Sequence, residues 1–168
     1  MSFFIPDLIL NTVLDVTPEL LASLGVKAAI LDVDNTLTTH GNPEPALGVQ
    51  EWIDEMQTAG IPLMIVSNNV MERVRPFAQR LGLPFVSMGC KPLTFGFTKA
   101  CKRFGRKPKE VAIIGDQIFT DVLGGSLKGM KTILVNPLDV DTGLVFRIKR
   151  RLERRFVRKY HRLKGDYS

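Results

Sequence analysis

The sequence of 168 residues has few cysteines and histidines and contains no long hydrophobic run. Cys90 and Cys101 are its only cysteines; they lack the paired spacing of a zinc site, and both histidines, His40 and His161, are remote from them. We therefore expect two reduced thiols, as in a cytoplasmic protein. No apolar run approaches the roughly 20 residues that a membrane-spanning helix needs. The apolar first ten residues lack the positive leader and the cleavage site of a signal peptide, so we expect them to be retained.

The composition is that of a soluble globular protein, with 45% hydrophobic and 24% charged residues, and the length fits one domain. The net charge of +6 is unevenly distributed. Residues 147–164 contain ten Lys or Arg and one Glu, whereas residues 1–146 contain 13 basic and 15 acidic residues. The main body is therefore slightly acidic and carries a basic tail, so any anionic partner is expected to bind that tail.

Short apolar runs alternate with helical patterns along the chain. The predicted strands are Lys27–Val33, Pro62–Val66, Pro84–Val86, Val111–Ile114 and Thr132–Val135. The predicted helices are Leu47–Thr58, with Leu47 on its apolar face, Val70–Leu81, with Val70 on its apolar face, Thr94–Phe104 and Phe119–Leu127. Strands that alternate with helices predict an α/β fold, a Rossmann-like three-layer sandwich with a central parallel sheet.

Polar side chains follow the predicted strands. Parallel sheets bind ligands beyond the carboxyl ends of their strands, so these side chains are expected at one edge. They are Asp32, Asp34, Asn35 and Thr36 after the first strand, Ser67 and Asn68 after the second, Lys91 after the third, and Asp116 and Asp121 after the fourth. Asp32 and Asp34 start on the same face of a strand, where two carboxylates repel each other and are costly to desolvate. A divalent cation and phosphate chemistry would account for such a pair.

These segments resemble, in order, the four motifs of the haloacid dehalogenase superfamily of aspartyl-phosphate phosphatases. The resemblance implies that Asp32 is the nucleophile, which forms an acyl phosphate. It implies that Asp34 protonates the leaving oxygen and then activates water. Ser67 and Asn68 would bind the phosphoryl group, and Lys91 would supply a fixed positive charge to it.

The same resemblance implies a Mg²⁺ site, since this ion prefers hard oxygen ligands in an octahedral array. Asp32, the main-chain carbonyl of Asp34 and Asp116 would bind the ion. Asp121 would bind it directly or through a water molecule.

The spacing of the motifs leaves no room for a cap domain. Asp34 and Ser67 are separated by 32 residues, and Ser67 and Lys91 by 23, and each interval is filled by one helix and one strand. The chain therefore resembles the capless subfamily IIIA, with an open site covered at most by residues 38–45. An open site suits a lipid headgroup, a phosphoprotein or a nucleic-acid end, or closure by another subunit, and the sequence leaves the oligomeric state open.

We expect three segments: an apolar N-terminal segment (1–24), the phosphatase domain (25–140) and a basic amphipathic C-terminal helix (141–168). The apolar residues of this helix are Val145, Ile148, Leu152, Phe156, Tyr160 and Leu163. We favour its binding to an anionic phospholipid membrane surface over packing on its own domain, and place nucleic-acid binding third. The N-terminal Phe3–Ile5 and Leu8–Leu10 either join it at the bilayer or pack over an edge of the sheet.

The chain also resembles a narrower group, the short YqeG-type phosphatases related to phosphatidylglycerophosphate phosphatases. The resemblance rests on residues 31–37, residues 115–125 and the basic tail. It implies a phospholipid monoester substrate. From the two free cysteines and the basic tail, we expect a cytoplasmic protein that lies peripherally on the inner face of the membrane.

Three alternatives remain: a phosphatase of a soluble metabolite, an RNA-associated factor that binds through the basic tail, and a receiver-type phosphorylation module. A receiver needs its acceptor Asp on a middle strand. Here the second and third strands end in Ser67 and Ser87, so the receiver is disfavoured.

Overall fold

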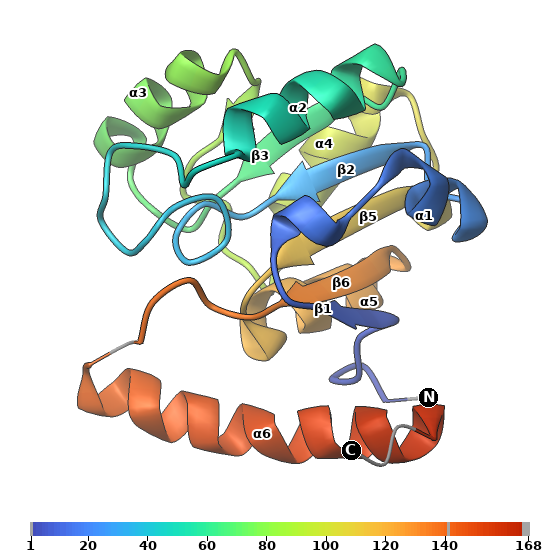
Figure 1. The fold of residues 1–168 in the computed structure, drawn as a ribbon, viewed down its shortest axis with the longest axis vertical. Helices are drawn as coiled ribbons and strands as arrows, with labels where there is room; N and C mark the ends of the chain where they lie inside the picture. Colours follow the sequence, from blue (N-terminus) through green and yellow to red (C-terminus); the bar gives the residue numbers. More distant parts are fainter. Residues whose placement is uncertain (1, 141, 166–168) are drawn as a thin grey trace.

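The computed structural model describes residues 2–140 and 142–165, and its centre is a parallel sheet of six strands (Figure 1). The strands are β1 (Leu8–Leu10), β2 (Ala28–Leu31), β3 (Leu63–Val66), β4 (Phe85–Val86), β5 (Val111–Gly115) and β6 (Lys131–Val135). Their order is β1-β6-β5-β2-β3-β4, so β2 and β5 are neighbours at the centre of the sheet. The five predicted strands are present, and β1 is an additional strand at the edge.

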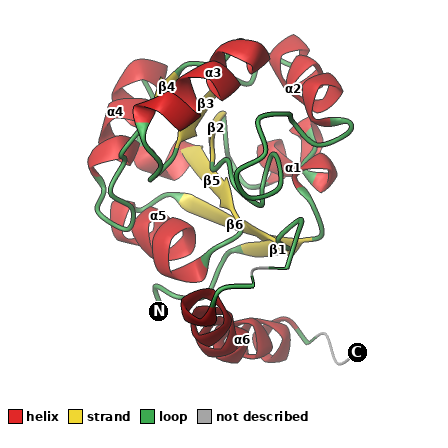
Figure 2. Cartoon of the chain, turned by 90° about the vertical axis from the view of Figure 1, so that its left-hand side faces the viewer, coloured by secondary structure: helices red, strands yellow, loops and turns green. Residues whose placement is uncertain are grey.

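Helices cover both faces of the sheet (Figure 2). One face packs against α1 (Pro18–Ser23), α2 (Val49–Thr58) and α3 (Met71–Leu81), and the other against α4 (Phe95–Phe104) and α5 (Leu123–Lys128). Alternate residues of β2 serve the two layers: Ala29 and Leu31 join the core of α2 and α3, and Ala28 and Ile30 join that of α4. This arrangement confirms the predicted three-layer α/β sandwich.

Two predicted core residues lie outside the helices. Leu47 is 96% exposed and Val70 is 49% exposed. The helix α2 begins after Gly48, whose φ of 86° turns the chain, so Leu47 does not share the apolar face of that helix. Val70 is the N-cap of α3 and has an extended conformation, so it too does not belong to the apolar face of its helix. The expectation that these two side chains are buried was wrong.

The predicted helix 119–127 consists of a π-helical turn, η3 (Ile118–Val122), followed by α5. Two further turns, η1 (Val13–Asp15) and η2 (Pro108–Glu110), precede α1 and β5. A Cβ atom at Gly125 would lie 2.4 Å from Ile113 Cγ2, so glycine permits the close approach of α5 to β5.

The N-terminal segment packs against the edge of the sheet. Leu8, Ile9 and Leu10 of β1 pair in parallel with β6. Phe4 stacks on Phe156 with ring centroids 4.9 Å apart and meets Phe119 edge-on at 5.8 Å. For these residues, the sheet-edge alternative is therefore confirmed.

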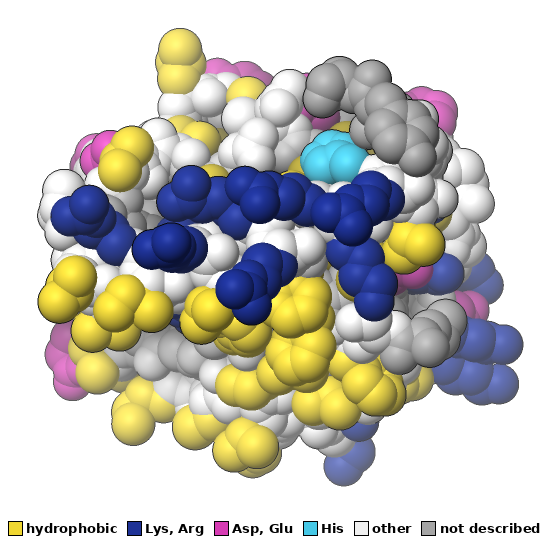
Figure 3. Space-filling model, turned by 90° about the horizontal axis from the view of Figure 1, so that it is seen from below, with side chains coloured by type: hydrophobic (Ala, Val, Ile, Leu, Met, Phe, Trp, Pro, Cys, Tyr) yellow, Lys and Arg dark blue, Asp and Glu magenta, His cyan; other side chains and the backbone are white. Residues whose placement is uncertain are grey.

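The basic segment forms α6 (Leu144–Lys164), a helix of 21 residues across the base of the molecule in Figure 1. Glu153 and Tyr160 are buried, and Phe156 packs on the domain. Other apolar residues of the predicted face remain exposed: Val145 (77%), Ile148 (55%), Leu152 (45%) and Leu163 (68%). Seen from below, basic side chains form a row beside a field of hydrophobic side chains (Figure 3).

The domain therefore covers only part of the apolar face of α6. Among residues 2–140 and 142–165, no helix is long and apolar enough to cross a bilayer. Residues 1, 141 and 166–168, which belong to the predicted N- and C-terminal segments, lie outside the described part of the chain.

Candidate active site

The carboxyl edge of the sheet brings three acidic residues together. Asp32 follows β2, Asp116 follows the neighbouring β5, and Asp121 lies in η3. One carboxylate oxygen from each residue lies within 4.8 Å of the others, and all three residues are buried. A Cβ atom at Gly115 would lie 2.3 Å from Asp121 Oδ2, so only glycine lets this carboxylate approach the end of the strand.

Lys91 joins two of these acids. Its Nζ donates hydrogen bonds to Asp32 Oδ1 at 2.8 Å and to Asp121 Oδ1 at 2.7 Å, and its side chain is 2% exposed. Burial opposes the charge on Lys91, but the carboxylates of Asp121 and Asp32 outweigh it and raise the pKa of the amine. Lys91 is therefore a fixed cation beside Asp32 and Asp121.

Asn68 fixes the main chain of Lys91. The Lys91 N–H donates to Asn68 Oδ1 at 2.7 Å, and Asn68 Nδ2 donates to the Lys91 carbonyl at 2.9 Å. The side chain that the sequence assigned to phosphate binding is thus directed to the neighbouring lysine. Ser67 is buried beside it, and its Oγ accepts the Asn69 N–H at 3.1 Å, which leaves the hydroxyl proton available for donation.

Ionisation of the acidic cluster, Asp32, Asp116 and Asp121, is unfavourable because the carboxylates are buried close to one another. Burial raises the pKa of Asp32 to about 6; Lys91 lowers this value and Asp121 adds to it. Burial, with the nearby charges of Asp32 and Asp121, raises the pKa of Asp116 well above its ordinary value. Raised pKa values of neighbouring acids mean that additional positive charge would stabilise the ionised cluster.

The donor set fits a divalent cation. Asp116 Oδ2 accepts a hydrogen bond from Arg150 of α6. Its other oxygen, Oδ1, is buried and has no hydrogen-bond partner among the residues that the structure describes. An unpartnered carboxylate oxygen among clustered acids is an oxygen ligand for a hard cation, which Asp32, Asp116 and Asp121 would hold. Such a cation would offset the charge of a bound phosphate.

Asp34 is held apart from these three acids. Its Oδ2 accepts from Asn69 Nδ2 at 2.8 Å, and its Oδ1 accepts from Arg73 at 3.0 Å and from the Gly41 N–H at 3.0 Å. Arg73 also donates to the Asn42 carbonyl at 2.7 Å, which ties residues 38–45 to the site. The side chain of Asp34 is therefore held in place by these donors, separately from the acidic cluster.

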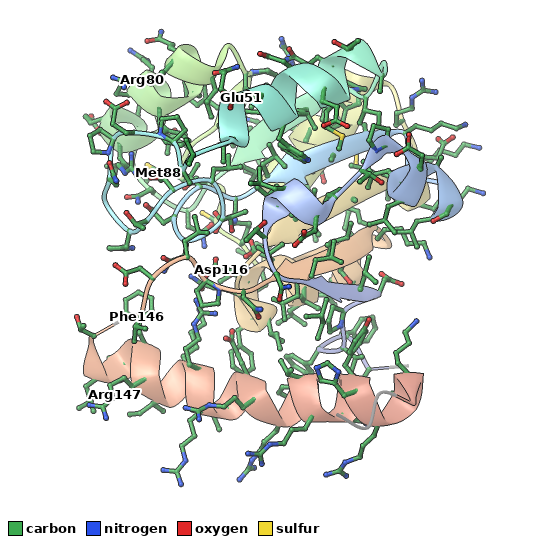
Figure 4. All side chains as sticks on the ribbon, in the orientation of Figure 1. Glu51, Arg80, Met88, Asp116, Phe146 and Arg147 are labelled. Carbon is green, nitrogen blue, oxygen red and sulfur yellow. The ribbon has the colours of Figure 1, made fainter. Side chains whose placement is uncertain are left out.

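The active-site pocket has a volume of about 330 Å³, and Asp32, Asp34, Ser67 and Lys91 all line it. Its rim comes from two segments. His40 of the 38–45 loop meets Phe146 of α6, with ring centroids 6.0 Å apart. Figure 4 shows Phe146 on the side of α6 that faces the body of the molecule. No cap domain is inserted within the described chain, as predicted. The expectation that residues 38–45 alone would cover the pocket was wrong, because Phe146 and Lys149 of α6 also line it.

Residues of α6 that the sequence analysis missed support the site. Buried Glu153 accepts the N–H of Ile118 at 2.8 Å and that of Phe119 at 3.4 Å, and it pairs with Arg150 at 3.1 Å. Arg150 also donates to the Asp116 carbonyl. The signal available in the sequence was Glu153 itself, the single acid among ten basic residues.

Comparison with known proteins identifies the family. The sequence profile of haloacid dehalogenase-like hydrolases matches residues 41–127. The chain is 40% identical over 156 residues to "Probable phosphatase YqeG" of Bacillus subtilis (strain 168), across 93% of this chain and 91% of that protein. The chain belongs to the haloacid dehalogenase-like hydrolase family. It is a phosphatase, as the predicted motif order implied.

Two solved structures of phosphatases support the fold of this haloacid dehalogenase-like hydrolase. The magnesium and phosphate complex of the D,D-heptose 1.7-bisphosphate phosphatase from B. bronchiseptica has a TM-score of 0.56 and 14% identity, covering 65% of this chain and 80% of that one. The cobalt-bound deoxy-D-mannose-octulosonate 8-phosphate phosphatase from Haemophilus influenzae has a TM-score of 0.54 and 16% identity, covering 82% and 90%.

A more distant relative of this hydrolase is phosphatidylglycerophosphate phosphatase 1, chloroplastic/mitochondrial, of Arabidopsis thaliana. The two are 23% identical over 171 residues, which cover 96% of this chain. The chain spans about half of that relative, 49% of its length.

Proposed function

We propose that this phosphatase hydrolyses phosphatidylglycerophosphate through an aspartyl-phosphate on Asp32. The observation that carries the mechanism is the buried contact of Asp32 with Lys91 in the open active-site pocket. Above a pH of about 6 the Asp32 carboxylate is ionised, and a permanent cation lies beside it. A carboxylate in this state is a nucleophile that does not need a separate base.

The reaction proceeds in two displacements at phosphorus. Asp32 attacks, the bond from phosphorus to the ester oxygen breaks, and Asp34 gives its proton to the departing alcohol. Asp34 then takes a proton from water, which attacks the same phosphorus and releases inorganic phosphate and free Asp32. Lys91 and the Ser67 hydroxyl stabilise the charge on the transferring group. We assign Mg²⁺ as the cation of the acidic cluster because its donors are all oxygen atoms.

Three observations support a lipid substrate. The pocket is open, α6 contributes Phe146 and Lys149 to its rim, and a distant relative is a phosphatidylglycerophosphate phosphatase. The outer face of α6 is basic and partly apolar, which suits an anionic bilayer. We therefore expect the enzyme to act peripherally on the inner face of a membrane.

The test is phosphate release from phosphatidylglycerophosphate in mixed micelles, compared with release from soluble sugar phosphates. We expect the lipid to be hydrolysed far faster, and the reverse ranking would reject the lipid substrate in favour of a soluble metabolite. Asp32→Asn should abolish turnover of every substrate while the protein stays folded. Asp54→Asn, an identical change at an exposed position of α2, should leave turnover unchanged. Full activity of Asp32→Asn would reject the mechanism.

A further inference from the structure

A second and larger hollow lies on another side of α6. This groove, about 940 Å³ in volume, runs between α6 and the chain from Leu134 to Val140. The two hollows use different residues of the helix, since Phe146 and Lys149 line the active-site pocket whereas Leu144, Arg147, Ile148, Arg151 and Arg154 line the groove. The groove therefore differs from the active-site pocket in its α6 residues, although Asp116 of the acidic cluster also lines it.

The groove carries excess positive charge. Arg147, Arg151 and Arg154 recur at intervals of four and three residues, so they share one face of α6. All three are exposed, and within the described part of the chain none of them forms an ion pair. Of the acids that line the groove, Asp116 and Glu153 are paired with Arg150, and Asp139 is the third. The three arginines therefore favour an anionic ligand.

Apolar side chains adjoin these arginines. Val140, Leu144 and Ile148 line the groove and are 82%, 72% and 55% exposed. On the face where α6 lies, Figure 3 shows a row of basic side chains directly beside hydrophobic side chains. A ligand that covers both kinds of side chain must carry an anionic group and a hydrocarbon part.

We propose that this groove binds an anionic phospholipid of a bilayer. The lipid phosphate lies against Arg147, Arg151 and Arg154, and an acyl chain covers Leu144 and Ile148. A nucleic acid would satisfy the arginines but would leave the apolar wall in water. The site is not catalytic, and it does not depend on which phosphomonoester the active site hydrolyses.

The charge arm of the test measures binding of the full chain to phosphatidylglycerol vesicles and to phosphatidylcholine vesicles by sedimentation. The groove variant combines Arg147→Gln, Arg151→Gln and Arg154→Gln. The matched control combines Arg155→Gln, Arg158→Gln and Arg162→Gln, which remove the same charge from exposed positions of α6 outside the groove. We expect the groove variant to lose at least about tenfold in affinity for phosphatidylglycerol and the control to lose much less.

Equal losses of affinity in the two triple variants would mean that α6 binds vesicles by its overall charge. This result would reject the groove as the lipid-binding site. Equal binding of the unmodified chain to both kinds of vesicle would overturn it as well. Thermal unfolding of each variant shows whether it is folded, and because these arginines have no ion pairs within the described chain, we expect unchanged transitions.

The apolar arm uses tryptophan fluorescence with brominated phosphatidylglycerol, against the background of the single, buried Trp52. Ile148→Trp should be quenched strongly, and Leu163→Trp, at an exposed position outside the groove, only weakly. Equal quenching contradicts a specific site. Displacement of the chain from vesicles by single-stranded RNA, together with unchanged vesicle binding of Ile148→Ser, would identify nucleic acid as the partner and reject the lipid. Micellar phosphate release is measured separately, so the two proposals fail independently.

Discussion

Lys91 is the residue whose environment is most unusual, because one amine compensates two buried carboxylates. Its contacts with Asp32 and Asp121 are both shorter than 3 Å in side chains that solvent barely reaches. The attraction in such a group offsets the cost of desolvation only while every member is present. Removing the amine leaves like charges facing each other without compensation.

We therefore predict that Lys91→Met lowers the free energy of unfolding of the metal-free protein by about 3–5 kcal/mol at a pH of about 8. Urea denaturation measures the change. A divalent cation should restore part of the loss, because it supplies positive charge to the same carboxylates. Lys102→Met, at an exposed position of α4, should change the free energy of unfolding little. An unchanged unfolding midpoint for Lys91→Met would contradict the role of Lys91 in the cluster.

The pKa of Asp32 leads to a second prediction at this scale. Burial raises this pKa from 3.8 to about 6, so the folded state binds the proton more tightly than the unfolded state. The stability that this tighter proton binding by Asp32 contributes is therefore present at low pH and is lost as the pH rises from about 4 to about 6. Two pKa units correspond to about 3 kcal/mol, and Asp116 acts in the same direction.

We expect the difference in thermal stability between the metal-free protein and Asp32→Asn to change across this pH window, with the variant gaining relative stability as the pH rises. Mg²⁺ should raise the transition temperature of the unmodified chain more at a pH of about 8 than at about 5, since the ion needs the ionised acid. A constant difference across the window would contradict the raised pKa.

At the scale of elements, much of the active site follows from the topology of a parallel sheet. Asp32 and Asp116 come together because β2 and β5 are neighbours that point in the same direction. Alternating strands and helices predict this edge, so residues at strand ends can be assigned to it from the sequence alone. Lys91 lies five residues beyond β4, and the Asn68 side chain brings it back to the same edge.

The parts that the sequence did not predict depend on long-range contacts without a local pattern. β1 has only three residues, too few for alternation to distinguish a strand from an apolar loop. The docking of α6 depends on Glu153, which accepts main-chain N–H groups of η3, and every residue except proline offers such a donor. The position of Glu153 in the sequence does not indicate that it contacts η3. The apolar periodicity of α6 is equally compatible with a face exposed to solvent, a face inserted in a bilayer and a face packed on the domain.

Since α6 and η3 meet through Glu153, we predict that this side chain affects metal binding. Glu153→Ala removes the acceptor of two N–H groups and the partner of Arg150, which holds Asp116. Loss of such supporting contacts typically weakens metal affinity by about 10–100-fold. Isothermal titration with Mg²⁺ measures the change. Glu51→Ala, on the exposed face of α2 (Figure 4), is the matched control. Equal affinities for the two variants would show that α6 does not support the metal ligands.

At the scale of the whole molecule, charge is separated between a slightly acidic body and one basic helix. Residues 147–164 contain ten of the 23 basic residues, and α6 runs across one side of the molecule (Figure 1). Near an anionic surface this asymmetry orients the molecule with α6 toward the surface. Because Phe146 and Lys149 belong to both α6 and the rim of the active-site pocket, this orientation brings the rim close to the surface.

We therefore predict that salt controls the activity on anionic micelles. Raising NaCl from about 0.1 M to about 1 M shortens the screening length from about 10 Å to about 3 Å. Each basic residue near the surface contributes about 1 kcal/mol, so screening of several of them should reduce binding at least tenfold. Phosphate release from a lipid phosphomonoester should fall accordingly in micelles that also contain an anionic lipid. In micelles whose only anionic lipid is the substrate, phosphate release should fall less. An equal decline in both kinds of micelle would mean that salt acts on the acidic cluster and Lys91 rather than on α6.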